Sequence, residues 1–118
     1  MESYDLLYID DEQLNLDLFR INFSKDFKVL TIDSPLKALE VIKNSNFKVI
    51  ISDYKMPDMN GLELIGEIKK QHPDVPCIIL SGYVETDVHA NKEILYKYLT
   101  KPWKKSELID IFNNAINN

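Results

Sequence analysis

The spacing of hydrophobic and polar positions alternates along the chain between two patterns, one typical of strands and one typical of helices. Short apolar runs rich in β-branched residues are typical of strands, and they occupy residues 4–9, 27–32, 47–52, 76–81 and 96–101. Apolar residues spaced three and four apart indicate helices, which are predicted at residues 12–24, 34–45, 61–71, 84–94 and 104–117. The pattern is therefore a strand followed by a helix, repeated five times.

The predicted helices differ in how clearly their apolar faces are defined. The first carries two adjacent apolar stripes, Leu14, Leu18 and Ile21 on one side and Leu16, Phe19 and Phe23 beside them. The second has Ser34 as its N-cap and Pro35 at its first position, with a stripe formed by Ala38, Leu39 and Ile42. Segment 84–94 is polar with sparse apolar periodicity, so we expect a short, displaced or partly disordered helix there, the most mobile element of the chain.

The strands at 47–52 and 76–81 are apolar at almost every position. Such strands are covered on both faces, as in parallel sheets. Crossover connections between parallel strands are right-handed, which places helices on both sides of the sheet. The expected fold class is therefore α/β, with a doubly wound parallel sheet of five strands.

Composition and charge narrow the possible functions. The 118 residues correspond to one domain, residues 1–118, with 45% apolar and 28% charged residues. No apolar run approaches the roughly 20 residues of a membrane helix, and the N-terminus lacks signal-peptide features, so we expect a cytoplasmic protein without membrane contact. The net charge of −5 and the lack of a Lys/Arg cluster argue against direct nucleic-acid binding. Cys77 lies in an apolar run, as a buried structural thiol would.

Polar residues follow four of the predicted strands, at the ends where ligands of parallel sheets bind. These residues are Asp10, Asp11 and Glu12, then Asp53, then Ser81 and Gly82, and finally Lys101 and Pro102. Carboxylates brought together repel one another, and Mg²⁺, which prefers oxygen ligands, relieves that repulsion. With a cation bound, Asp53 becomes a feasible nucleophile for a phosphoryl group. Lys101 and Ser81 could then hold phosphoryl oxygens, and Gly82 leaves room for the group.

Each of these residues also has a simpler interpretation. Asp10 fits a helix capping box with Gln13, and Asp53 could merely terminate a strand. Lys101 alone would be a solvated surface lysine. The phosphoryl-transfer interpretation is favoured because complementary groups follow four strands in the required order.

Four motifs, "YIDDE", "ISDYKMPDMNG", "ILSGY" and "YKYLTKPW", resemble the receiver domain of bacterial two-component response regulators. The resemblance covers essentially the whole chain in order. It implies a flavodoxin-like fold with strand order 2-1-3-4-5. It also implies that Asp53 is the phosphoacceptor, which takes its phosphoryl group from the phosphohistidine of a sensor histidine kinase or a phosphotransfer protein.

The same resemblance implies further roles. Asp10 and Asp11 would hold Mg²⁺ together with Asp53, one of the pair largely through water, and the backbone carbonyl of Lys55 would be another ligand. Further roles implied are a switch hydroxyl at Ser81, a switch aromatic at Tyr98, and a cis bond between Lys101 and Pro102. The alternative for Tyr98 is an ordinary half-buried strand residue.

Side chains beside the pocket are expected to tune the lifetime of the phosphate. Lys55 and Tyr83 would shield the acyl phosphate from water, while Gly82 leaves the pocket open for the phosphoryl group, so we predict slow autodephosphorylation. Trp103 is expected to pack at the start of the last helix. His72 and His89 are expected on the surface.

The expected output surface is formed by segments 84–94, 96–101 and 104–117. A downstream protein or output domain would read it, and phosphorylation-dependent dimerisation is a further possibility. The chain is either a stand-alone receiver or one cut from a longer regulator. It would act on no substrate beyond its own phosphate.

The residues argue against three competing functions. A Mg²⁺-dependent phosphatase with an aspartyl intermediate needs a second aspartate two residues after Asp53, where this chain has Lys55. A flavin-binding module needs amides and hydroxyls in the first loop, which here is acidic. A docking module that works without phosphorylation would not need the complete set of pocket residues.

Overall fold

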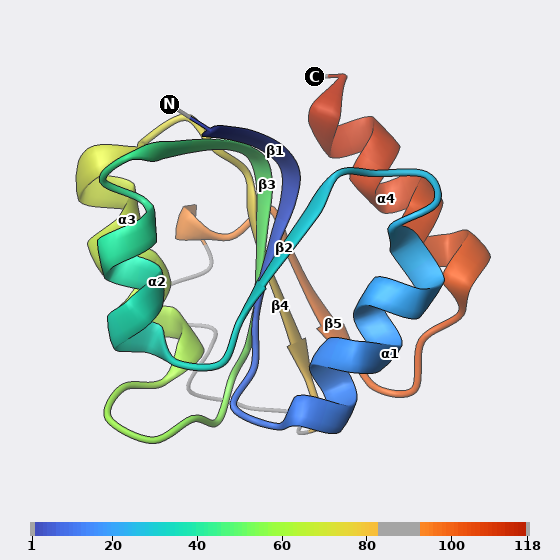
Figure 1. Cartoon of the computed structure of the whole chain (residues 1–118), viewed down its shortest axis with the longest axis horizontal. Helices are drawn as coiled ribbons and strands as arrows, with labels where there is room; N and C mark the ends of the chain where they lie inside the picture. The colour runs from blue at the N-terminus through green and yellow to red at the C-terminus, as the bar shows by residue number, and fades with distance from the viewer. Residues whose placement is uncertain (1, 83–92, 118) are drawn as a thin grey trace.

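The computed structural model describes residues 2–82 and 93–117 and places a central parallel sheet between two layers of helices (Figure 1). The strands are β1 (Glu2–Ile9), β2 (Val29–Ile32), β3 (Ser45–Asp53), β4 (Cys77–Ser81) and β5 (Lys97–Thr100). The helices are α1 (Gln13–Phe23), α2 (Pro35–Val41), α3 (Gly61–Gln71) and α4 (Lys105–Ile116). The strand order is β2-β1-β3-β4-β5 with every pair parallel, which confirms the expected fold class and strand order.

Alternation along the strands creates a separate core on each face of the sheet. Leu6 and Tyr8 of β1 point to the face that α1 and α4 cover, whereas Leu7 and Ile9 point to the face under α2 and α3. Successive side chains of a strand point to opposite faces, so both sets are buried. Cys77 is buried in the second core as a free thiol, as predicted.

The core under α1 and α4 is rich in aromatic rings. Phe23 of α1 packs edge-on against Phe112 of α4, with ring centroids 5.3 Å apart. Trp103, which precedes α4, packs on Phe23 at 5.5 Å, where the sequence predicted it to pack. Aromatic pairs in these geometries stabilise beyond the area that they bury. The contacts fix the start of α4 and the segment before it against α1.

Helix α1 uses only one of its two apolar stripes. Its buried residues are Leu16, Phe19 and Phe23. The other stripe is exposed, with 67% of Leu14, 45% of Leu18 and 75% of Ile21 accessible to solvent. The sequence pattern could not rank the two stripes, and the one with two phenylalanines is the one that the sheet covers.

The boundary between α2 and β3 lies earlier than predicted. Ser34 caps α2 by accepting a hydrogen bond from the Lys37 amide at 3.4 Å, but the helix ends at Val41, not at residue 45. β3 begins at Ser45 because Glu2 and Ser3 extend the ladder of β1 and pair with Ser45 and Asn46. Tertiary pairing therefore converts polar residues, which carry no strand signal, into strand.

Other differences are smaller. β2 begins at Val29, not at residue 27, because the Phe27 amide continues the end of α1 by bonding to the Phe23 carbonyl at 3.0 Å. Most of the helix predicted at 84–94, with Tyr83 and His89, lies outside the described residues, so its predicted mobility stays a prediction. Among the described helices none has the length and apolar character to cross a membrane.

Candidate functional site

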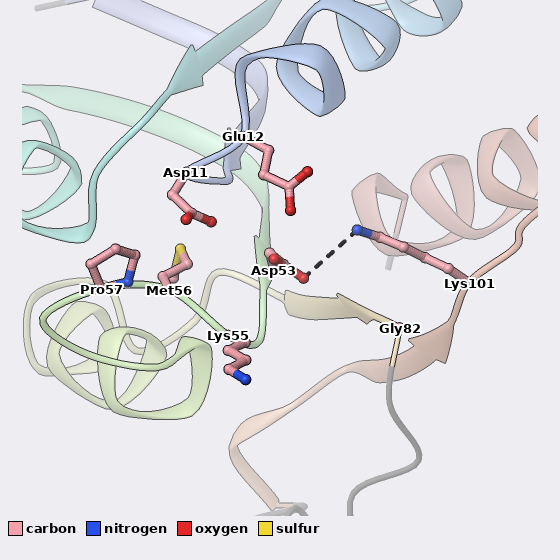
Figure 2. Close-up of a pocket in the computed structure, with 8 residues that line it drawn as sticks. All are labelled: Asp11, Glu12, Asp53, Lys55, Met56, Pro57, Gly82 and Lys101. Atoms are coloured by element: carbon pink, nitrogen blue, oxygen red, sulfur yellow. Dashed lines mark ion pairs between the residues drawn. The ribbon is translucent and has the colours of Figure 1, made fainter.

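The carboxyl ends of β1, β3, β4 and β5 surround a cleft of about 700 Å³ (Figure 2). The strands β1, β3, β4 and β5 are successive neighbours in the sheet, so their carboxyl ends lie together. Parallel sheets bind ligands outside these ends. The cleft is lined by Asp11, Glu12, Asp53, Lys55, Met56, Pro57, Gly82 and Lys101. Residues that the sequence singled out on separate strands thus face one cavity.

Three carboxylates form the acidic part of the site. Asp10, Asp11 and Asp53 each place a carboxylate oxygen within 4.8 Å of the other two. Asp10 is fully buried and Asp53 is 9% exposed, whereas Asp11 is open to solvent. Carboxylates this close repel one another. Their oxygens are the ligand type that Mg²⁺ takes, so the residues present fit a hard divalent cation.

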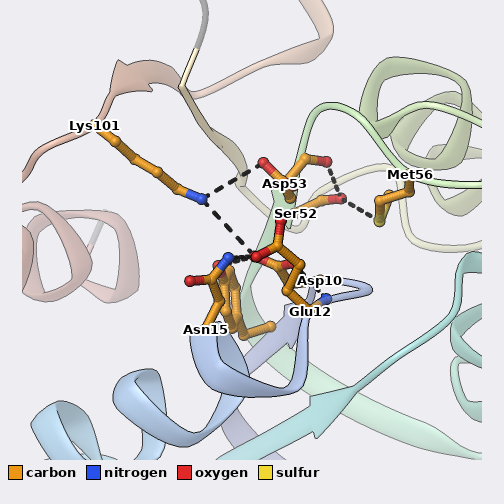
Figure 3. A network of polar contacts seen from close by, with 8 residues as sticks. Asp10, Glu12, Asn15, Ser52, Asp53, Met56 and Lys101 are labelled. Atoms are coloured by element: carbon orange, nitrogen blue, oxygen red, sulfur yellow. Dashed lines mark hydrogen bonds and ion pairs between the residues drawn. The ribbon is translucent and has the colours of Figure 1, made fainter.

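Lys101 supplies the positive charge of the site. Its ammonium nitrogen lies 3.8 Å from Oδ1 of Asp53 and 3.9 Å from Oδ2 of Asp10 (Figure 3). The Lys101 backbone amide bonds to the Ser81 carbonyl at 2.7 Å, and the bond from Lys101 to Pro102 is cis. The side chain is 30% exposed. It therefore points into the cleft, unlike an ordinary surface lysine.

The environment of Asp53 disfavours its charged form. Burial, followed by the nearby Asp10 carboxylate, raises the pKa of Asp53 from 3.8 to about 6, although the Lys101 ammonium opposes the rise. A cation or an incoming electrophile would stabilise the charged form of Asp53. The site is therefore arranged to receive positive charge or to form a bond at Asp53.

Asp10 is held by three hydrogen-bond donors. Its Oδ2 accepts from the Tyr8 hydroxyl at 2.6 Å and from the Asn15 side-chain amide at 3.1 Å, and its Oδ1 accepts from the Glu12 backbone amide at 3.0 Å. Burial and the neighbouring Asp10 charge raise the pKa of Tyr8, so its hydroxyl keeps the proton that it donates. The capping box of Asp10 with Gln13 is wrong, because the N-cap of α1 is Glu12 and no side chain caps it.

Sequence reasoning missed Tyr8 and Asn15. A signal for Tyr8 existed, because a residue two positions before Asp10 on a strand shares its face of the sheet. Asn15 lies in the first turn of α1, and nothing in its spacing distinguished it from a solvated helix residue. Contacts between a strand and the following helix depend on packing, which local patterns do not describe.

The loop after Asp53 returns tightly to the strand end. The Gly61 amide bonds to the Tyr54 carbonyl at 2.7 Å, and a Cβ on Gly61 would clash with the Asp53 carbonyl oxygen and lie 3.2 Å from the Tyr54 Cα. Asp58 adopts a φ of 74°, in the left-handed region that aspartate and asparagine tolerate. A capping box between Asn60 and Glu63 starts α3. These contacts set the path of the segment that lines the cleft.

Other predicted residues lie around the cleft at different depths. Ser81 is fully buried at the end of β4 and is not among the described residues that line the cleft, whereas Gly82 is. Tyr98 is half-buried on β5 and packs against the core under α2 and α3. His72 is partly exposed, and its Nε2 lies 2.7 Å from the Ile42 carbonyl oxygen.

The fold and the site agree with what is found in known proteins. Residues 6–113 match the model of the response regulator receiver domain. The chain therefore belongs to the response regulator receiver domain family. The resemblance seen in the sequence motifs is confirmed.

Individual relatives are similar over nearly the whole chain. The hydrogenase transcriptional regulatory protein HoxA of Cupriavidus necator is 31% identical over 94% of this chain, which spans 24% of that protein. A receiver domain protein from Clostridium thermocellum is 36% identical, with a TM-score of 0.86 over 99% of this chain and 95% of that one. The response regulator TrrA of Thermotoga maritima, solved in complex with Mg²⁺-BeF, is 24% identical, with a TM-score of 0.83 over 98% and 99% of the two chains, which shows the fold alone.

Proposed function

We propose that this chain is a phosphorylation-controlled signalling switch in which Asp53 accepts a phosphoryl group from the phosphohistidine of a sensor histidine kinase. The observation that carries the proposal is the position of Lys101, whose ammonium lies within 4 Å of Asp53 and Asp10 in a cleft with three carboxylates. Opposite charges arranged in this way match the two needs of phosphoryl transfer, positioning and charge stabilisation.

In the proposed transfer, a carboxylate oxygen of Asp53 attacks phosphorus. The phosphorus–nitrogen bond breaks, its electron pair stays on the imidazole, and an acyl phosphate forms on Asp53. Lys101 exchanges its partner Asp53 for a phosphoryl oxygen. Because the second half of β3, from Val49 to Asp53, is buried at every position, the nucleophile is held in place at the end of a packed strand.

Asp10, Asp11 and Asp53 would hold Mg²⁺, with the backbone carbonyl of Lys55 as a further ligand. When bound, Mg²⁺ neutralises charge on the carboxylates and on the phosphoryl oxygens. The raised pKa of Asp53 supports this assignment, since a cation offsets the repulsion that raises it. The complex of the related TrrA with Mg²⁺-BeF is consistent with it.

Phosphorylation would be read through Ser81, Tyr98 and Lys101. The phosphate adds a charge of about −1.5 to −2, and contacts with it would shift an equilibrium between inactive and active conformations. The surface that includes β5 and α4 would carry the change to an output domain or a partner. The chain spans about a quarter of the transcriptional regulatory proteins HoxA and GlrR, 24% and 26%, which supports an output elsewhere in those regulators.

The proposal is tested by the intact mass of the protein after incubation with acetyl phosphate and MgCl₂. We expect a gain of one phosphoryl group that EDTA prevents and that Asp53→Asn abolishes. Asp58→Asn is the matched control, because Asp58 lies in the same loop at a φ that asparagine also favours, and it should be phosphorylated like the wild type. No gain in the wild type, or an equal gain in Asp53→Asn, would overturn the proposal.

The same sample separates the switch from the alternative of a Mg²⁺-dependent phosphatase. A switch does not hydrolyse phosphate monoesters, whereas a phosphatase with an aspartyl intermediate turns over small phosphate esters continuously. Lys55 stands where such an enzyme needs an acid/base carboxylate, so we expect no turnover of p-nitrophenyl phosphate. Steady turnover that Asp53→Asn abolishes would favour the phosphatase.

A further inference from the structure

Asp10 differs from the other two carboxylates in how firmly it is held. Asp11 is exposed, whereas Asp10 is fully buried and accepts a hydrogen bond from the Tyr8 hydroxyl. It also accepts from Asn15 and from the Glu12 amide, which Figure 3 shows beside it. Tyr8 and Asn15 have no part in the transfer described above. Their common target is one atom, Oδ2 of Asp10.

The Tyr8 hydroxyl is fixed in direction by packing. Tyr8 is 2% exposed, and its ring stacks on Phe19 of α1 with centroids 4.2 Å apart and planes at 15°. Both Tyr8 and Asp10 belong to the side of β1 that faces α1, so the phenol ring reaches along the sheet to the carboxylate. The donor is therefore positioned before any ligand arrives.

The hydrogen bonds decide which oxygen of Asp10 stays available. A carboxylate oxygen has about two acceptor positions. Two donors already occupy Oδ2, and Lys101 lies 3.9 Å from the same atom. Oδ1 accepts only the Glu12 amide among the hydrogen bonds described here, so the remaining acceptor position of Asp10 is on Oδ1.

We propose that Tyr8 and Asn15 are positioning residues for the cation: they orient Asp10 so that Oδ1 is presented to Mg²⁺ or to its bound water, and they thereby raise the affinity for Mg²⁺. The inference rests on the proposed function, because it presumes the Mg²⁺ site. Groups that hydrogen-bond a metal ligand fix its orientation, and their loss typically weakens metal binding about 10- to 100-fold. Neither side chain touches the phosphoryl group in this account.

The test is the dissociation constant for Mg²⁺, measured by titrating ¹⁵N-labelled protein with MgCl₂ and following amide chemical shifts. Tyr8→Phe removes one oxygen and keeps the stacked ring, and we expect it to raise the dissociation constant about tenfold. Asn15→Ala should also raise it, at a position where alanine suits the helix. Tyr4→Phe is the matched control, since Tyr4 lies near the other end of β1, stacked on Phe47, and should leave the affinity unchanged.

A second measurement separates positioning from a merely structural role. If Tyr8 acts through the cation, the phosphorylation rate of Tyr8→Phe with acetyl phosphate should return to near the wild-type rate at saturating MgCl₂. Loss of structure would instead lower the rate at every concentration of Mg²⁺ and change the dispersion of the amide spectrum.

The outcomes keep this inference separate from the proposed function. If wild type binds Mg²⁺ and both Tyr8→Phe and Asn15→Ala bind within twofold of it, the positioning role is wrong and the switch proposal stands. A wild type that does not bind Mg²⁺ would overturn the proposed function itself. Should Tyr8→Phe not fold, Asn15→Ala alone decides the question.

Discussion

The position of the charged Asp53 side chain lowers the stability of the folded protein. Burial and the Asp10 carboxylate raise its pKa to about 6, so near pH 7 the folded protein keeps an ionised group in surroundings that stabilise the charge less than water does. The unfolded chain lacks such surroundings, and its Asp53 titrates near 3.8. The charge that makes Asp53 a nucleophile therefore destabilises the metal-free fold.

We predict that Asp53→Asn increases the free energy of unfolding of the metal-free protein by about 1–2 kcal/mol at pH 7.5. Each unit of pKa shift corresponds to about 1.4 kcal/mol, and screening at the open cleft reduces the full value. Between pH 3.8 and 6 the folded state binds more protons than the unfolded state. The loss of stability caused by the Asp53 charge therefore has its full size above the pKa of the folded protein. It disappears as the pH falls toward 3.8.

Urea unfolding in EDTA at pH 7.5 and at pH 5 measures this effect. The increase in the free energy of unfolding caused by Asp53→Asn should be smaller at pH 5 than at pH 7.5. Asp58→Asn, in the same loop, should show no comparable dependence on pH. A gain that grows toward acid pH would contradict the assignment of the cost to the Asp53 charge.

Individual elements differ in how far their own sequence determines them. α3 begins and ends where the pattern predicts, at Gly61 and Gln71, because a capping box and a single apolar stripe define it locally. α1 has two apolar stripes, and only packing against the sheet decides between them. β3 starts earlier than predicted, at Ser45, because the ladder between β1 and β3 extends further than the apolar residues do.

The start of α3 permits a direct test of close packing. A Cβ at Gly61 would clash with the Asp53 carbonyl oxygen, whereas a Cβ at Gly66, in the same helix, meets nothing within 4 Å. We predict that Gly61→Ala destabilises the protein by about 2–3 kcal/mol through overpacking. Gly66→Ala should stabilise it by about 0.5–1 kcal/mol, since alanine favours the helix.

Urea unfolding of both variants at one pH makes the comparison. The opposite signs are the diagnostic result, because a general intolerance of α3 to alanine would lower the stability of both. Equal effects in the two variants would show that the contact between Gly61 and the strand end does not limit the packing.

At the scale of the whole molecule, periodicity predicts the order of strands and helices along the chain. The meeting of Asp10, Asp53 and Lys101 at one end of the sheet requires the strand order 2-1-3-4-5, which the resemblance to receiver domains implied and the structure confirms. The partners of Asp10 could not be predicted, because Tyr8 and Asn15 meet it only after α1 packs on the sheet. Interactions between elements require the three-dimensional arrangement.

At this scale we predict that Mg²⁺ stabilises the entire fold. A ligand that binds only the folded state adds RT ln(1 + [L]/Kd), which is about 1.4 kcal/mol at ten times Kd. Thermal unfolding with MgCl₂ should occur at a higher temperature, and EDTA should reverse the shift. Asp11→Asn should lose most of the effect, whereas Asp74→Asn, placed between α3 and β4 away from the cleft, should keep it.

Added NaCl at matched ionic strength separates specific binding from screening of the net charge of −5. An equal shift with NaCl, or an undiminished shift in Asp11→Asn, would contradict a specific cation site at the three carboxylates.

The loop from Tyr54 to Gly61 is closed at its base by a backbone hydrogen bond and by the contact of Gly61 with the strand end. For a protein engineer, this makes it a loop whose side chains can be varied between fixed attachment points. Lys55, Met56 and Pro57 line the cleft and can be varied in a combinatorial library without moving Asp53. Asp58 would be limited to residues that tolerate its φ of 74°. The persistence of a phosphate signal could thus be selected for while the rest of the receiver keeps its natural sequence.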